Sequence, residues 1–146
     1  MGLPQPTSAV ERGLLRDRIE VLKPKKPAAV APETPISEVL KTMISQSIGC
    51  VLIVDGQNRV LGIFSERDAL MRVNVDFARL AARPVSTVMT PNPETLRVQD
   101  KIAFALHRMN VGGFRHVPVT DGGKLAGVIS IRDILAYLTA QGSGRA

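Results

Sequence analysis

Two short stretches of the chain carry residue types that could bind a phosphorylated, hydroxyl-bearing ligand. They read GIFSERD over residues 62–68 and GVISIRD over residues 127–133, each where an apolar run passes into a helical pattern. A helix start offers free N–H groups and a positive dipole end to a phosphate, and arginine adds charge-assisted bonds. A serine hydroxyl adds a donor, and a carboxylate one turn later can accept both hydroxyls of a ribose. The pattern therefore favours a nucleotide site, with Ser65, Arg67 and Asp68 in the first stretch and Ser130, Arg132 and Asp133 in the second.

The same spacing also has a purely structural interpretation. Ser-x-x-Asp is a helix capping box, in which the hydroxyl and the carboxylate bond to backbone N–H groups of the first turn. For a single copy, capping alone would be the simpler explanation. Two copies at equivalent places keep ligand binding open beside it.

The two stretches belong to a longer internal repeat. Aligning the copies places Pro27 on Pro93, Asp55 on Asp121 and Asp68 on Asp133. Each copy predicts the order strand, helix, strand, strand, helix. Thr34, followed by Pro35, and Asp100 are the expected N-caps of the first helix of each copy. The remaining elements are expected at Ala28–Ala31, Val51–Val54, Val60–Phe64 and Glu66–Val73, and at Glu94–Arg97, Val117–Thr120, Leu125–Ile129 and Ile131–Leu138.

The doubled Gly-h-h-Ser-x-x-Asp ending, where h is an apolar residue, and this order of elements resemble a pair of CBS domains (cystathionine-β-synthase domains, a Bateman module) from about Pro27 to Leu138. The resemblance implies an α/β fold of the α+β type. In it, two β-α-β-β-α repeats related by a pseudo-two-fold axis pack through their sheets and leave two clefts between the motifs. It also implies a stand-alone, non-catalytic regulatory protein that senses cellular energy or redox state. The implied partners are a second copy of the chain, as a homodimer, and an effector protein.

By the same resemblance, the clefts bind an adenosine compound: AMP, ADP, ATP, NAD(H) or S-adenosylmethionine. Asp68 and Asp133 would hold ribose hydroxyls, and Ser65 and Ser130 would approach phosphate. The copies differ before the hairpin, where the second reads FRHVP over residues 114–118 and the first reads IGCVL over residues 48–52. Arg115 and His116 are candidate phosphate partners there, or else surface residues at a strand start. Val117 and Pro118 are expected to flank the adenine, and the family often has a proline where the first copy has Leu52.

The chain is basic, with a net charge of +6, and much of the excess lies in an N-terminal arm. Residues 1–26 hold six Lys and Arg against three Asp and Glu, an excess of +3. A capping-box pattern at residues 8–11 predicts a helix to about Leu22, whose apolar stripe should dock on the repeats or on a second subunit. The alternative function is a nucleic-acid-binding or protein-binding accessory factor that uses this arm. Nucleic acid is disfavoured because no aromatic residue lies among the arm's basic residues.

The expected organisation is a basic N-terminal helix and linker over residues 1–26, repeats over 27–88 and 89–141, and a frayed tail over 142–146. The single cysteine, Cys50, excludes an internal disulfide and is interpreted as a small buried hydrophobe. No Cys/His cluster has zinc spacing, and no catalytic residue is assigned: the only histidines are His107 and His116, and no nucleophile elbow or P-loop occurs. No apolar run reaches the length of a membrane span, so we expect a metal-free cytoplasmic protein without a membrane partner.

Overall fold

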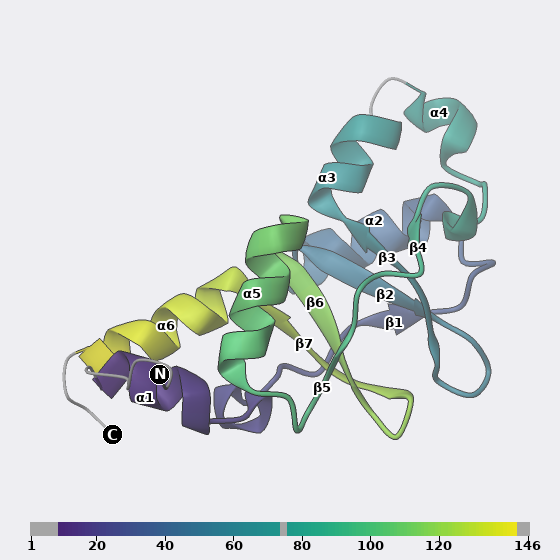
Figure 1. The fold of residues 1–146 in the computed structure, drawn as a ribbon. Coiled ribbons are helices and arrows are strands. Elements are labelled where there is room, and N and C mark those ends of the chain that lie inside the picture. Colours follow the sequence, from purple (N-terminus) through teal and green to yellow (C-terminus); the bar gives the residue numbers. More distant parts are fainter. Residues whose placement is uncertain (1–8, 74–75, 143–146) are drawn as a thin grey trace.

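The computed structural model describes residues 9–73 and 76–142, and it contains the predicted repeat twice (Figure 1). Each copy runs strand, helix, strand, strand, helix, as expected. The first copy consists of β1 (Ala29–Val30), α2 (Ile36–Gln46), β2 (Cys50–Val54), β3 (Val60–Ser65) and α3 (Glu66–Asp68), which continues as the π-helix η2 (Ala69–Val73). The second consists of β5 (Leu96–Arg97), α5 (Ile102–Gly112), β6 (His116–Asp121), β7 (Lys124–Ser130) and α6 (Ile131–Gly142).

Each repeat builds its own sheet, and the segment leading into one repeat pairs with the sheet of the other. In the first sheet β1 is parallel to β2, and β2 is antiparallel to β3. The edge of β3 pairs with β4 (Thr90–Pro91), where Thr90 lies opposite Ile63. In the second sheet, of order β5-β6-β7, Lys25 lies opposite Val128 of β7. Because Ile63 and Val128 are equivalent in the two copies, Lys25 occupies the register position of Thr90.

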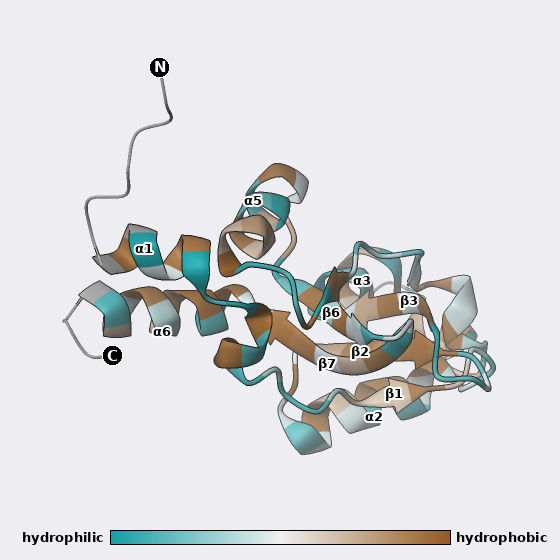
Figure 2. Cartoon of the chain, turned by 60° about the horizontal axis from the view of Figure 1, so that its bottom comes forward, coloured by the Kyte–Doolittle hydropathy of each residue, from teal (hydrophilic) through white to brown (hydrophobic). Residues whose placement is uncertain are grey.

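The sheets pack face to face, as predicted, and the alternation of side chains along β2 shows how. Val51 and Ile53 face the core of the first repeat, which α2 covers. Cys50 and Leu52 point to the opposite face, where they form a separate buried cluster with Ile63 and with Leu125 of the second repeat. Figure 2 shows these apolar strands in the middle of the molecule. Both faces of β2 are therefore buried, which explains its uninterrupted apolar sequence.

The predicted side-chain caps on α2 and α5 are wrong. The N-cap residues are Pro35 and Lys101, and neither makes a side-chain cap bond. Carbonyls from distant segments satisfy the first helical N–H groups instead: Ile36 N–H donates to Arg83, and Ile102 N–H donates to Asp17. The chain thus caps these helices through tertiary contacts, which satisfy the unpaired N–H groups that every helix start leaves.

The N-terminal arm lies on the second repeat. It forms α1 (Ala9–Arg16) and the 3-10 helix η1 (Ile19–Leu22), so the prediction of one helix to Leu22 is wrong; Ser8 lies outside the described residues. The break lets Ile19 enter the second core, where its side chain is completely buried. Ile19 N–H donates to Asp100, and α1 lies beside α6 (Figures 1 and 2). Docking on the repeats is therefore confirmed.

The connection between the repeats contributes to the first core. It contains α4 (Phe77–Leu80) and the 3-10 helix η3 (Val85–Thr87) before β4. Leu80 and Val85 are buried against α2 and the first sheet. Among the described helices, none is long and apolar enough to cross a membrane.

Candidate functional site

Both Ser-x-x-Asp motifs lie where the last strand of a repeat ends and a helix begins. At the end of β3, Asp68 Oδ2 accepts bonds from the N–H (2.9 Å) and the hydroxyl (3.1 Å) of Ser65. The Asp68 N–H donates back to Ser65 Oγ at 3.3 Å, which completes a capping box. At the end of β7, Asp133 Oδ2 accepts from the N–H (2.7 Å) and the hydroxyl (3.2 Å) of Ser130. Each carboxylate therefore uses one oxygen to hold its own strand-to-helix turn.

The remaining carboxylate oxygens have different surroundings. Asp68 Oδ1 accepts a hydrogen bond from the Thr90 hydroxyl at 3.0 Å and lies 3.8 Å from Arg72 Nε. The Asp68 residue is only 7% exposed. Asp133 is half-buried, and its Oδ1 has no hydrogen-bond partner within the described part of the chain. The two motifs, alike in sequence, thus offer one occupied and one available oxygen.

The two repeats meet closely at Gly49, just before β2. A Cβ placed on Gly49 would lie 2.7 Å from Glu66 Oε1 and 3.2 Å from His116 Nε2, closer than a side chain tolerates. Glu66 begins α3 of the first repeat, whereas His116 begins β6 of the second. The missing side chain of Gly49 therefore allows a carboxylate and an imidazole from different repeats to converge on one point.

His116 is in an electrostatically mixed environment. Burial lowers its pKa below the ordinary value of 6.5, the charges of Glu66 and Asp133 act in the opposite direction, and that of Arg115 lowers it further. The imidazole is therefore mainly neutral at pH 7, able to donate one hydrogen bond and accept another. The candidate phosphate partners Arg67 and Arg132 of the two motifs, and Arg115 next to His116, are all exposed.

The strand residues expected to flank a ligand are part of the sheet. The Val117 side chain is buried in the core of the second repeat, and its backbone pairs with Ile129. Pro118 is also buried and lies opposite Val128. Any contact of Val117 with a ligand would therefore be made by its backbone.

The structure adds four residues that the sequence reasoning did not select: Gly49, Glu66, Arg72 and Thr90. Glu66 stood inside the motif, but nothing in its spacing indicated that it lies beside His116. Gly49 occupies the position equivalent to Arg115, and that substitution of an arginine by a glycine was the available signal. No sequence signal pointed to Thr90 or Arg72, because the contact of Thr90 with Asp68 depends on the path of the segment that connects the repeats.

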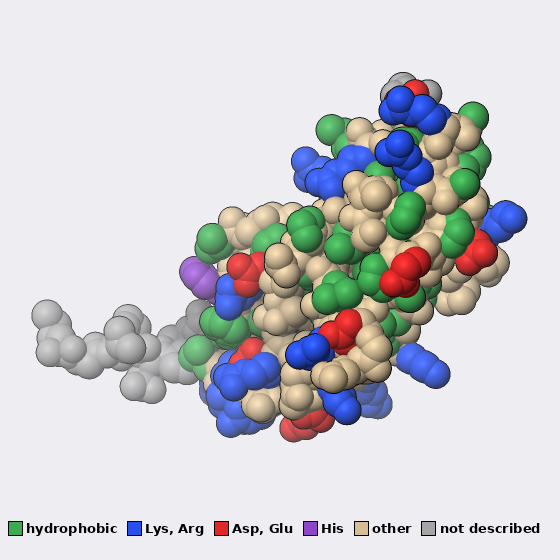
Figure 3. All heavy atoms as spheres, turned by 90° about the vertical axis from the view of Figure 1, so that its right-hand side faces the viewer, with side chains coloured by type: hydrophobic (Ala, Val, Ile, Leu, Met, Phe, Trp, Pro, Cys, Tyr) green, Lys and Arg blue, Asp and Glu red, His purple; other side chains and the backbone are tan. Residues whose placement is uncertain are grey.

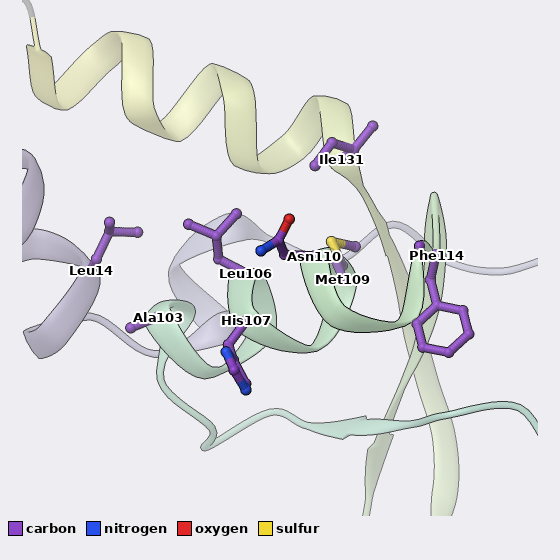
Figure 4. A pocket seen from close by; sticks show the side chains of 9 residues that line it. Leu14, Ala103, Leu106, His107, Met109, Asn110, Phe114 and Ile131 are labelled. Carbon is purple, nitrogen blue, oxygen red and sulfur yellow. The ribbon is translucent and has the colours of Figure 1, made fainter.

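An open groove of about 710 Å³ lies elsewhere, between α1, α5 and the start of α6 (Figure 4). Its lining is mostly apolar, including Leu14, Leu106 and Phe114; of the two motif stretches only Ile131 reaches it, and none of their Ser, Arg or Asp residues does. Cys50 is buried, and that burial raises the pKa of its thiol to about 11, so it is a poor nucleophile. No group of three or more potential metal ligands occurs among the described residues.

Comparison with known proteins defines the class of the chain. The family model "CBS domain" matches residues 20–74 and 85–140, which are the two repeats. The chain therefore belongs to the CBS domain family, as the sequence resemblance implied.

Individual relatives agree with this. An uncharacterized 17.7 kDa protein of Acidianus ambivalens is 33% identical over 122 residues, covering 83% of this chain and 73% of the relative. The CBS domain-containing protein CBSCBSPB1 of Arabidopsis thaliana is 34% identical over 84% of this chain, which spans only 21% of that longer protein.

Solved structures share the fold. The CBS-domain containing protein ATU1752 from Agrobacterium tumefaciens has a TM-score of 0.75 at 34% identity, covering 83% of this chain and 98% of that one. CBSX2, determined in complex with AMP, has a TM-score of 0.69 at 21% identity, covering 82% of this chain and 95% of that one. The structure of the CBS domain pair of protein MJ0100 was determined in complex with 5'-methylthioadenosine and S-adenosylmethionine. It has a TM-score of 0.76 at 20% identity, covering 86% of this chain and 98% of that one.

Proposed function

We propose that this CBS pair is a regulatory module that binds an adenosine-containing ligand, such as AMP, ADP, ATP, NAD(H) or S-adenosylmethionine, between its two repeats. The observation that carries the proposal is the available oxygen of Asp133, held by Ser130 at the end of β7 and close enough to His116 to affect its pKa. The AMP, methylthioadenosine and S-adenosylmethionine complexes of two proteins with this fold support the choice of an adenosine compound.

The residues present fit such a ligand. Asp133 Oδ2 is fixed by Ser130, so Oδ1 is pre-oriented to accept ribose hydroxyls without a loss of side-chain freedom on binding. Gly49 leaves the point between the repeats free of a side chain. The exposed guanidinium of Arg132, next to Asp133 at the start of α6, is available to a phosphate. The arrangement serves binding and orientation, and the proposal assigns no reaction to it.

A calorimetric titration of the purified chain with AMP, ATP, NADH, 5'-methylthioadenosine and S-adenosylmethionine tests the proposal. We expect at least one of them to bind and Asp133→Ala to weaken that binding by about tenfold or more. Asp121→Ala is the matched control, because Asp121 is an exposed acidic residue of the same repeat, at the end of β6. Absence of binding by every adenosine compound would refute the proposal.

We further propose that the protein acts as a homodimer, in the cytoplasm, and signals through an effector protein. Large apolar side chains are exposed on several helices, notably Ile44 on α2 (80%), Met71 on η2 (74%) and Val111 on α5 (72%). Light scattering of wild type and of Ile44→Glu and Met71→Glu tests the dimer, which the charged variants should weaken. The nucleic-acid alternative loses its main support, because the arm is docked on the second repeat, and in the lower part of the face shown in Figure 3 the Lys and Arg side chains lie beside acidic ones.

A further inference from the structure

We infer that the two motif carboxylates have different roles: Asp133 binds the ribose of the ligand, whereas Asp68 holds the segment that connects the repeats. Each chain would therefore bind one ligand. This inference rests on the proposed function and specifies which of two sequence-equivalent positions performs it.

Both carboxylate oxygens of Asp68 already accept hydrogen bonds from the protein. Its Oδ2 holds the turn at Ser65, and its Oδ1 holds the Thr90 hydroxyl at 3.0 Å with Arg72 Nε 3.8 Å away. Only 10% of the side chain is exposed. A ribose would have to compete with the threonine for Oδ1 and approach past the arginine, and displacing the threonine would leave its half-buried hydroxyl without this partner. That desolvation cost opposes binding at this position.

The partners of Asp68 show what it does instead. Thr90 belongs to β4, the strand that the connection adds to the first sheet. Arg72 continues the same network, since its Nη1 donates to the carbonyls of Val88 (3.1 Å) and Met89 (2.9 Å). Asp68, Arg72 and the residues before β4 thus form one polar cluster that anchors the chain as it leaves the first repeat. This is a structural use of the carboxylate.

Asp133 has no such cluster. The position equivalent to Thr90 is occupied by Lys25, which bonds to Val128 through its backbone: Lys25 N–H donates to the Val128 carbonyl at 3.2 Å, and Val128 N–H to the Lys25 carbonyl at 3.0 Å. The lysine side chain is exposed and makes no ion pair with Asp133 within the described residues. Lys25 therefore pairs with β7 through its backbone, as Thr90 pairs with β3. It has no hydroxyl that could donate to Asp133 as Thr90 donates to Asp68.

The matched substitutions Asp133→Asn and Asp68→Asn, which keep side-chain shape, test the division. Isothermal titration with AMP and with 5'-methylthioadenosine gives stoichiometry and affinity, and thermal unfolding gives stability. We expect one ligand per chain, an affinity loss of about tenfold or more in Asp133→Asn, and an affinity within about threefold of wild type in Asp68→Asn. Asp68→Asn should instead lower the melting temperature more than Asp133→Asn.

Thr90→Val and Arg72→Met remove the two partners singly and keep the test decisive if Asp68→Asn does not fold. Both should melt earlier and bind with unchanged affinity and stoichiometry. Two ligands per wild-type chain, or a tenfold affinity loss in Asp68→Asn, would overturn the inference while leaving the proposed function intact. If neither probe binds the wild type but another adenosine compound does, that compound becomes the probe with the same expectations. Failure of every adenosine compound would overturn both.

Discussion

Replacing Ile19 by alanine tests whether the N-terminal arm is an integral part of the second repeat. Ile19 is completely buried with Leu96, Ile129 and Ile134, which come from three different elements of that repeat. The backbone around it is fixed as well, because Ile19 N–H donates to Asp100 at 2.9 Å. The surroundings cannot collapse easily into the space that the shorter side chain would leave.

The expected cost follows from burial and geometry. Removing a fully buried isoleucine side chain to alanine costs about 2–5 kcal/mol, and the constrained backbone places Ile19→Ala in the middle of that range, at about 3 kcal/mol. Val21, two residues later in η1, is 51% exposed. Val21→Ala should therefore change the free energy of unfolding by no more than about 0.5 kcal/mol, and it is the matched control.

Equilibrium unfolding in urea measures this difference. For a chain of this length, about 3 kcal/mol corresponds to a fall in melting temperature on the order of 10 °C. Nucleotide affinity, measured below the transition, should be unchanged in both variants because the hydrogen bonds that position the Asp133 carboxylate come from Ser130 and do not involve the arm. Equal stability of Ile19→Ala and Val21→Ala would refute the reasoning, and the arm would again be a candidate for binding nucleic acid.

Three further predictions concern charged and polar groups. Burial lowers the pKa of His116 below 6.5, so the unfolded state binds the imidazole proton more tightly than the folded state does. The free energy of unfolding should therefore fall as the pH drops from about 6.5 toward the pKa of the folded state, and His116→Gln should abolish that fall. Glu66→Gln should strengthen AMP binding several-fold but leave adenosine binding unchanged, since it removes a negative charge beside His116, and added salt should reduce the gain. Tyr137→Phe removes the 2.6 Å bond from the Tyr137 hydroxyl to Asp17 Oδ2 and should cost about 1.5–3 kcal/mol of unfolding free energy.

Each of these has a clear contrary result. An unaltered pH dependence in His116→Gln would show that other groups dominate between pH 5 and 7. Equal gains for AMP and adenosine in Glu66→Gln would place the phosphate away from Glu66. Unchanged stability in Tyr137→Phe would mean that water replaces the hydroxyl at Asp17.

The fold could be predicted from the sequence because its determinants are local and occur twice. The apolar runs of β2 and β6, the turn residues between the strands and the Ser-x-x-Asp endings all lie within short windows, and the second copy confirms the first. The capping box of the first motif was predictable for the same reason, since Ser65 and Asp68 are three residues apart.

The differences between the two motifs could not be predicted, because they depend on contacts between segments distant in sequence. Thr90 reaches Asp68 only because the connection adds β4 to the first sheet. The first N–H groups of α2 and α5 donate to the carbonyls of Arg83 and Asp17, and no local sequence pattern indicates these partners. The break in the arm before Ile19 likewise arises from tertiary packing, because the local sequence was compatible with one unbroken amphipathic helix to Leu22.

The exchange of leading segments between the sheets carries a last prediction, that the two repeats unfold together. β4 leads into the second repeat but pairs with β3 of the first, and Lys25 leads into the first repeat but pairs with β7 of the second. The cluster of Cys50, Leu52 and Ile63 with Leu125 joins the same sheets, so separating the repeats would expose apolar surface and break both edge pairings.

Leu52→Ala tests this cooperativity, because Leu52 is completely buried in the cluster shared by the two sheets and lies on the opposite face of β2 from the first core. It should cost about 2–5 kcal/mol and lower the single transition of the whole chain. Hydrogen exchange followed at amides of α2 and α6 should report equal losses of protection, although only α2 belongs to the repeat that carries the substitution. If α2 lost protection while α6 kept that of the wild type, or if two transitions appeared, each repeat would be stable without the other, and the exchanged segments would be only surface contacts.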